Sequence, residues 1–355
     1  MKKYIGLEEM SNVNCSSVLN VIRNCKEVSR KQISDITGLS WGGMTKSVNK
    51  LFENEYIVEE KSEQNSGGGR IPNVISVNKK KHFVIGLDIN KSGFCAYVMN
   101  LCGDMLKEYF KETEFENSEE LLAEILNFTR GIFEEFWEGE ILAIGVAMQG
   151  ILDVENGVSV RFPDCSDWKN VPVRQILEET FGVNVFVEHD PNCMLYASLE
   201  EEDCDSVLLF RIDKSIGMAA SVKGRILSGN GIMEIAHQVV VPGGKPCKCG
   251  RQGCLEAYIK PCINHGQVQG EAISEMVGPL AVSIYNMARM FNSDVVILTG
   301  DLIKYRALFE KELVSKIQEF YREEKADIRF VDDTKSAVRG AALIAVQGAI
   351  DSIRI

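Results

Sequence analysis

The sequence has little that points to a membrane or to secretion: it contains no membrane-length apolar run, and we expect neither a secretory leader nor a disulfide framework. Apolar runs such as Val295–Leu298 have the length of a strand, far short of the roughly 20 residues that cross a bilayer. The first apolar stretch is broken by Glu8, Glu9 and Asn12, which argues against a signal peptide. Eleven cysteines are present, but only one group is closely spaced, so we expect reduced thiols in the cytoplasm.

Charge is divided unevenly along the 355 residues. The chain carries a net charge of −12, yet residues 1–81 contain 13 Lys and Arg against 9 Asp and Glu, whereas the remainder contains 26 against 42. A mildly basic N-terminal part on an acidic remainder is the pattern expected when only the N-terminal part contacts phosphates. The length predicts two or three globular domains.

The first 80 residues have the pattern of a helix-turn-helix. Apolar spacing predicts a helix over residues 17–24. Ser29 would cap a second helix over residues 30–37, which is expected to bury Ile33 and Ile36. A glycine then follows and permits the tight turn of this motif.

A third helix, capped by Ser40 and reaching about residue 54, would be the recognition helix. Its apolar residues recur at i, i+4 and i+7 and predict one buried stripe, formed by Met44, Val48 and Leu51. Thr45, Lys46 and Asn49 are therefore expected to face away from this stripe, where such side chains can contact bases and phosphates.

Two short strands around a glycine-rich tip predict a wing. Residues 56–58 precede the tip, Gly67–Gly69 and Arg70 form it, and an alternating strand follows over residues 74–77. Bare glycine backbone can lie close to DNA while Arg70 enters the minor groove. The alternative is a small helical domain followed by an ordinary flexible linker.

Beyond residue 80 an α/β pattern occurs twice. Each pass has two strands, a long helix and a further buried strand, at residues 82–89, 94–101, 119–137 and 141–146, then at 206–212, 218–222, from 273 onward and at 295–299. The pattern predicts two α/β lobes.

One cysteine group has the spacing of a metal site, His237-x9-Cys247-x-Cys249-x4-Cys254. Three thiolates and one imidazole can complete a tetrahedron around Zn²⁺ and leave no position open for catalysis, so we expect structural zinc. A cluster of reduced cysteines without metal is the alternative.

The segment Glu234-Ile-Ala-His237, continued by these cysteines and by Glu256, resembles the signature of the ROK family (repressors, open reading frames and kinases). Residues 145–153, 168–172 and 188–192 resemble further family segments in the same order. The resemblance covers nearly the whole chain.

The resemblance implies an N-terminal winged helix-turn-helix plus a two-lobed α/β body of the actin/hexokinase-like fold. The expected parts are the winged head over residues 1–80, a first lobe over 81–190 with a C-terminal helix of about 335–355 packed on it, and a second lobe over 191–334 that carries the zinc loop and a dimer interface.

The resemblance also implies a sugar site. The position of Asp190 is that of the general base of ROK kinases, read here as a sugar ligand, and His189 stands where the family has asparagine. The implied sugar-binding residues are Gly150, His189, Asp190, Glu234, His237 and Glu256. Carboxylates make charge-assisted hydrogen bonds to sugar hydroxyls.

The three phosphate turns of the family are altered. Residues 88–92 replace an Asp-x-Gly-Gly-Thr turn, residues 213–217 replace Gly-Thr-Gly-x-Gly, and Thr299-Gly300-Asp301 replaces a turn with a Gly-Gly pair. Bare backbone N–H groups bind phosphate in such turns, and side chains obstruct them. Because phosphoryl transfer depends on positioning and charge neutralisation, the sequence predicts that kinase activity is lost.

We therefore expect a sugar-responsive transcription regulator, a repressor of carbohydrate-utilisation genes that binds a palindromic operator as a homodimer or higher homo-oligomer. Two alternatives stay open. The first is a bifunctional ATP-dependent sugar kinase that also binds DNA, because Asp190 is present. The second is a DNA-binding protein that has lost its response to sugar.

Overall fold

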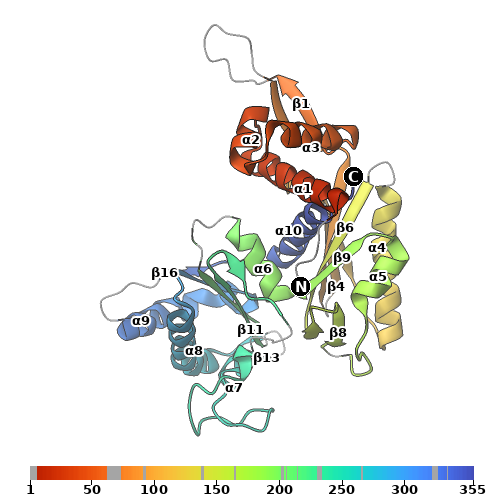
Figure 1. The fold of residues 1–355 in the computed structure, drawn as a ribbon. Coiled ribbons are helices and arrows are strands. Elements are labelled where there is room, and N and C mark those ends of the chain that lie inside the picture. Colours follow the sequence, from red (N-terminus) through yellow and green to blue (C-terminus); the bar gives the residue numbers. More distant parts are fainter. Residues whose placement is uncertain are drawn as a thin grey trace. The chain divides into compact units, whose positions relative to one another are not determined.

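The computed structural model describes residues 6–61, 73–90, 93–136, 140–163, 165–200, 204, 206–213, 215–229, 234–264, 267–321, 327–333 and 335–355. The chain forms two compact units (Figure 1). Unit 1 comprises Met1–Val146, Phe162–Val187 and Ala341–Ile355, and unit 2 comprises Ala147–Arg161 and Glu188–Gly340. None of the described helices is both long and apolar enough to cross a membrane.

Unit 1 begins with a head of three helices and a two-stranded sheet: α1 (Leu7–Cys25), α2 (Arg30–Thr37), α3 (Trp41–Glu53), β1 (Ile57–Lys61) and β2 (Asn73–Val77). Ser29 caps α2 in a reciprocal capping box with Gln32, and Gly38 ends the helix in the left-handed conformation at φ +69°. The strands β1 and β2 are antiparallel. The predicted three-helix head with paired strands is therefore present.

The head differs from the sequence expectation in two places. Ile36 is 59% exposed, so the prediction that α2 buries it was wrong; among the described residues of this helix only Ile33 is buried. Helix α1 begins ten residues before the expected start at residue 17. Tertiary contacts account for this extension, because Cys15 is fully buried and the Ser16 hydroxyl donates to the Ile350 carbonyl at 2.6 Å.

The rest of unit 1 is built on a five-stranded sheet in the order β5-β4-β3-β6-β9. Its strands are β3 (His82–Asn90), β4 (Gly93–Asn100), β5 (Met105–Glu112), β6 (Glu140–Met148) and β9 (Asn184–His189), and its helices are α4 (Ser118–Glu135), α5 (Val173–Phe181) and α10 (Ser336–Asp351). Helices α4 and α5 meet through Phe133 and Phe181, whose stacked rings lie 4.7 Å apart. Helix α10 packs so closely on β6 that a Cβ at Gly145 would collide with the Ala341 carbonyl.

Unit 2 has a second five-stranded sheet, in the order β12-β11-β10-β15-β16. In both sheets the strands follow the same scheme along the chain, third-second-first-fourth-fifth. Strands β10, β11 and β12 are antiparallel neighbours, whereas β15 and β16 run parallel to β10. The main strands and helices are β10 (Val207–Ile212), β11 (Ile216–Val222), β12 (Arg225–Ile226), β15 (Val295–Thr299), β16 (Asp327–Phe330), α6 (Asp190–Leu199), α8 (Gly270–Phe291) and α9 (Glu310–Tyr321).

The smaller elements of unit 2 are β7 (Ile151–Asp153), β8 (Val158–Arg161), the 3-10 helices η1 (Ile235–His237), η2 (Lys260–Cys262) and η3 (Asp301–Leu308), α7 (Glu256–Ile259), β13 (Ile263–Asn264) and β14 (Gln267–Val268). The core of unit 2 joins β10, through Leu208 and Phe210, to α8, through Met276 and Leu280. This core fixes the strand ends that carry the charged residues described next.

Candidate functional site

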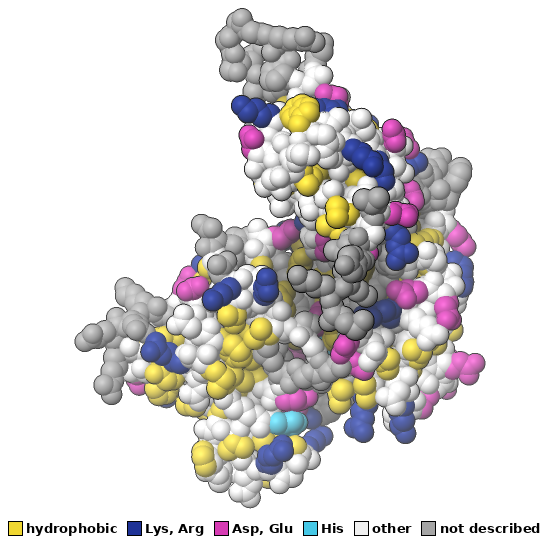
Figure 2. All heavy atoms as spheres, viewed as in Figure 1, with side chains coloured by type: hydrophobic (Ala, Val, Ile, Leu, Met, Phe, Trp, Pro, Cys, Tyr) yellow, Lys and Arg dark blue, Asp and Glu magenta, His cyan; other side chains and the backbone are white. Residues whose placement is uncertain are grey.

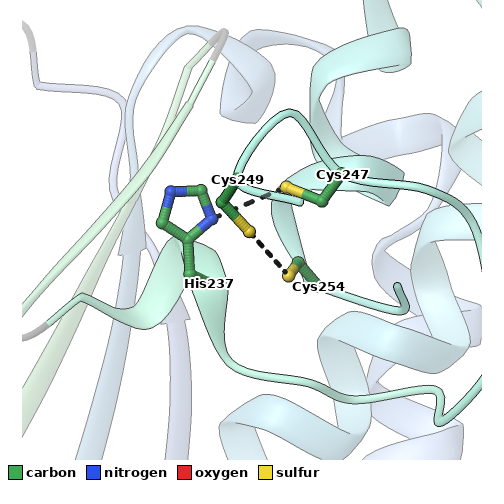
Figure 3. A group of neighbouring side chains, drawn as sticks. All are labelled: His237, Cys247, Cys249 and Cys254. Carbon is green, nitrogen blue, oxygen red and sulfur yellow. Dashed lines mark hydrogen bonds between the residues drawn. The ribbon is translucent and has the colours of Figure 1, made fainter. Parts of the chain in front are cut away.

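Four side chains of unit 2 converge as the cysteine spacing predicts (Figure 3). The potential ligand atoms of His237, Cys247, Cys249 and Cys254 all lie within 4.8 Å of one another. The sulfurs of Cys249 and Cys254 are 3.6 Å apart, and the Cys247 sulfur is 3.6 Å from His237 Nδ1. Tetrahedral zinc with Zn–S bonds of about 2.3 Å holds its sulfurs roughly 3.8 Å apart, so the donor set fits this metal.

The loop holds this geometry through its backbone. Gly253 has φ +77°, and a Cβ there would collide with the Val241 carbonyl. The amide of Cys247 donates to the Arg251 carbonyl at 2.8 Å and closes the turn that carries Cys249. A backbone hydrogen bond from Arg251 is the main cause that lowers the pKa of the Cys249 thiol to about 7, which favours the thiolate that a metal requires.

Two of the predicted sugar ligands lie beside the cluster. Glu256 is the first residue of α7, and its Oε2 lies 3.8 Å from His237 Nδ1 and 3.9 Å from the Cys247 sulfur. Since Nδ1 faces the cysteines, Nε2 of the same ring is left to face away from them (Figure 3). Glu234 immediately precedes η1 and is exposed.

Two of the remaining predicted ligands, His189 and Asp190, lie at the start of α6. Asp190 is the first residue of that helix and is buried. Glu188 accepts hydrogen bonds from the His189 backbone N–H at 2.8 Å, from Asn192 Nδ2 at 3.0 Å and from the Ser228 hydroxyl at 2.5 Å. Burial lowers the pKa of His189 and keeps its ring neutral. Gly150 has φ +98°, a conformation that suits glycine.

Asp190 forms an ion pair that the sequence analysis did not foresee. Its partner is Arg211 on β10, whose Nη1 contacts Asp190 Oδ2 and whose Nε lies 2.6 Å from Asp213 Oδ2. With its amide oxygen turned to the guanidinium, Gln149 accepts from Arg211 Nη1 at 3.3 Å and from Nη2 at 3.1 Å. One signal in the sequence could have revealed Arg211, since it is the one charged residue in the otherwise apolar strand Val207–Ile212.

Two of the altered turns meet each other directly. Asp213 Oδ1 accepts the backbone N–H of Asp301 at 2.7 Å, and a Cβ at Gly300 would lie 2.6 Å from the same oxygen. The side chain of Asp213 therefore binds the backbone donor that follows Gly300. The altered turn at residues 88–92 is described only as far as Asn90, so Lys91 and Ser92 lie outside the described residues.

The head presents part of the predicted DNA-contacting set. Lys46 and Asn49 are exposed on α3, whereas Thr45 is half-buried and its hydroxyl is enclosed, with no hydrogen-bond partner among the described residues. Arg70 lies outside the described residues. Trp41, which the sequence analysis did not single out, is 59% exposed at the first position of α3. Figure 2 shows Lys and Arg side chains over the head, mixed with Asp and Glu.

Comparison with known proteins places these features in a family. The model of the ROK family matches residues 84–261. The xylose repressor of Bacillus subtilis (strain 168) is 23% identical over 338 residues, which cover 87% of each chain. The DNA-binding transcriptional repressor Mlc of Escherichia coli (strain K12) is 25% identical over 307 residues, which cover 84% of this chain and 74% of Mlc.

Solved structures match the same fold. A ROK family transcriptional regulator, described as a homolog of the E. coli MLC protein, superposes with a TM-score of 0.82 at 19% identity and covers 96% of this chain and 97% of its own. The ROK hexokinase of Thermus thermophilus superposes with a TM-score of 0.64 at 23% identity and covers 74% of this chain and 97% of its own. The predicted fold class is thereby confirmed, and the chain belongs to the ROK family.

Proposed function

We propose that this protein is a sugar-responsive transcriptional repressor of carbohydrate-utilisation genes. The observation that carries the proposal is the combination, in one chain, of a three-helix head with paired strands and a ROK body. A relative named as a repressor matches over nearly the same length of chain, since the match to the B. subtilis xylose repressor covers 87% of both chains. We assign the head to residues 1–80, the first lobe to 81–190 with the C-terminal helix of about 335–355 packed on it, and the second lobe to 191–334.

The head would bind operator DNA through α3 and the wing. Exposed Lys46 and Asn49 are positioned for phosphates and base edges, and Thr45 and Arg70 complete the proposed set. We infer that the second lobe supplies a homodimer interface, so that two heads read a palindromic operator. Sedimentation of the full chain, with and without DNA, measures both stoichiometries.

The body would bind the sugar without phosphorylating it. The proposed ligands are Gly150, His189, Asp190, Glu234, His237 and Glu256, with structural zinc on His237 and the three cysteines. Zinc at that position would fix the His237 ring and hold the start of α7 beside it. Two observations support the absence of kinase activity: Asp190 is paired with Arg211, and Asp213 occupies the backbone donor of Asp301. A paired carboxylate is a poor general base.

A sugar can change DNA binding only if it binds one conformational state of the protein more tightly than another. The coupling is reciprocal, so operator DNA must change the affinity for sugar by the same factor. This equality can be measured directly by titrating the sugar into the free protein and into the operator complex.

The central experiment selects operator fragments with the full chain and then adds sugars one at a time. We expect one sugar to change operator affinity, and Glu256→Ala to abolish that change while leaving the DNA affinity of the sugar-free protein intact. Operator binding that no sugar affects would favour a regulator without a sugar response. Turnover of ATP that depends on both a sugar and Asp190 would instead establish the bifunctional kinase.

The zinc proposal has its own test. Metal analysis of the purified protein is expected to give one zinc per chain, and Cys254→Ser to lower both the zinc content and the unfolding temperature. Cys262→Ser is the matched control, because Cys262 is equally buried but bonds to the Tyr258 carbonyl outside the cluster. Equal zinc content in both variants would contradict the assignment.

A further inference from the structure

The surroundings of Asp190 carry information about the charge of the effector. Arg211 lies between two carboxylates, those of Asp190 and Asp213, and side chains of all three residues are at most 22% exposed. One positive and two negative charges leave these three side chains with a net charge of −1, in a place that is poorly screened by water. The nearby Glu188 is also buried and adds to the negative charge.

Each of the three nitrogens of the Arg211 guanidinium already lies against an acceptor of the protein. Its Nη1 is used by Asp190, its Nε lies against Asp213, and Gln149 accepts from both Nη1 and Nη2. An arginine binds phosphate strongly through two parallel N–H groups, and here each nitrogen that could supply one already faces a protein oxygen. A phosphate would have to displace a carboxylate from the guanidinium and then remain beside it.

The second carboxylate is held in place independently of Arg211. Asp213 Oδ1 accepts the Asp301 backbone N–H at 2.7 Å, while its other oxygen faces Arg211. Asp213 is therefore anchored at both ends and cannot swing away to admit an anion without losing a hydrogen bond. The Asp301 carboxylate lies outside this arrangement, because it is exposed and is paired with Lys304 at 2.9 Å.

We propose that the Asp190–Arg211–Asp213 network makes this protein selective for uncharged sugars, and that it excludes sugars that carry a phosphate near Asp190. The inference rests on the proposed function, in which Asp190 binds the effector. A sugar hydroxyl can donate to Asp190 alongside Arg211, because the hydroxyl brings no charge. Arg211 and Asp213 are specificity-determining residues that keep the network intact and negative.

The test compares pairs of ligands that differ only by a phosphate: glucose and glucose 6-phosphate, and N-acetylglucosamine and its 6-phosphate, with xylose as a further neutral probe. Calorimetric titration of the full chain is expected to show that any sugar that binds does so at least about 30-fold more tightly than its phosphate, since like charges brought together at a buried site are strongly unfavourable.

Asp213→Asn tests the network itself. The amide oxygen of asparagine can still accept the Asp301 N–H, but one negative charge is removed, so the discrimination against the phosphate is expected to fall about tenfold. Asp301→Asn is the matched control, because it removes an exposed carboxylate from the neighbouring turn and should leave the discrimination unchanged. A comparison of unfolding temperatures verifies that both variants are folded.

The outcomes are distinct. Tighter binding of a sugar phosphate than of its neutral sugar overturns the inference and leaves the proposed function standing. Equal discrimination in the wild type and in folded Asp213→Asn also overturns it. If neither member of any pair binds while operator DNA does, the proposed sugar response fails and the inference fails with it.

Discussion

The attachment of the head to the end of α10 can be tested with one substitution, Ile353→Ala. Ile353 is only 4% exposed, and it lies in the C-terminal segment that contacts two helices of the head, α1 and α3. On one side of it the Ile350 carbonyl accepts the Ser16 hydroxyl at 2.6 Å; on the other the Ile355 carbonyl accepts Lys50 Nζ at 2.6 Å. Loss of the Ile353 side chain should therefore loosen contacts with both α1 and α3.

The magnitude follows from the burial. A buried Ile→Ala substitution destabilises a protein by about 2 to 5 kcal/mol, and a site in a short terminal segment can relax, so we expect the lower part of this range, about 2 to 3 kcal/mol. For a unit of this size each kcal/mol corresponds to roughly 2 to 4 °C. The unfolding transition that involves unit 1 should fall by about 4 to 12 °C.

The measurement is thermal unfolding followed by circular dichroism, repeated in urea. Arg354→Ala is the control, because it changes the adjacent residue, whose side chain is exposed. We expect the control to shift the transition by no more than about 1 °C, since exposed substitutions away from special contacts change stability little. If Ile353→Ala unfolds at the same temperature as Arg354→Ala, the reasoning about this attachment is wrong.

Three further predictions concern the head, unit 1 and the metal loop. Lys46→Met should weaken operator binding and reduce its dependence on salt concentration by about one released counterion, whereas an unchanged salt dependence would remove Lys46 from the phosphate contacts. Hydrogen bonds from the Ser118 backbone and hydroxyl lower the pKa of Asp167 to about 2. The ionised Asp167 therefore stabilises the folded state fully above the pKa of the unfolded chain, about 4, and this contribution is lost as the pH falls toward 2. Asp167→Asn should therefore flatten the pH dependence of the unfolding temperature in that window, and parallel curves would refute this. Gly253→Ala should reduce zinc content, because the added Cβ collides with the Val241 backbone. Gly250→Ala is the control, since Gly250 also has a positive φ (+87°) but has open space around it; this variant should retain zinc and be less stable. Equal loss of zinc in both variants would mean that backbone strain alone governs metal binding by the loop.

Helices α2 and α3 of the head could be predicted because local chemistry decides them. The Ser29–Gln32 capping box and Gly38 lie within ten residues of one another, and the buried stripe of α3 follows from spacing alone. The exposure of Ile36 could not be predicted. It depends on which face of α2 the neighbouring helices cover, and that is a property of packing.

The same distinction applies to the candidate sites. The sequence by itself determined the cluster of His237 and the three cysteines, because side chains so close along the chain have few ways to lie apart. Three thiolates and one imidazole are the ligands typical of structural zinc, so the residue types also indicate the metal. The altered phosphate turns were also visible as substitutions, one turn at a time.

Only the tertiary structure decided which residues Asp190 and the altered turns contact. Asp190 lies on α6 and Arg211 on β10, whereas Asp213 follows β10 and Asp301 follows β15. The parallel pairing of β10 with β15 brings Asp213 to the Asp301 backbone amide. Since the partner of a charge is set by the nearest opposite charge in space, no spacing along the chain could show that Asp190 is paired or that Asp213 reaches the Asp301 amide. The attachment of residues 350–355 to the head is likewise decided by the fold, because it joins residues more than 300 positions apart.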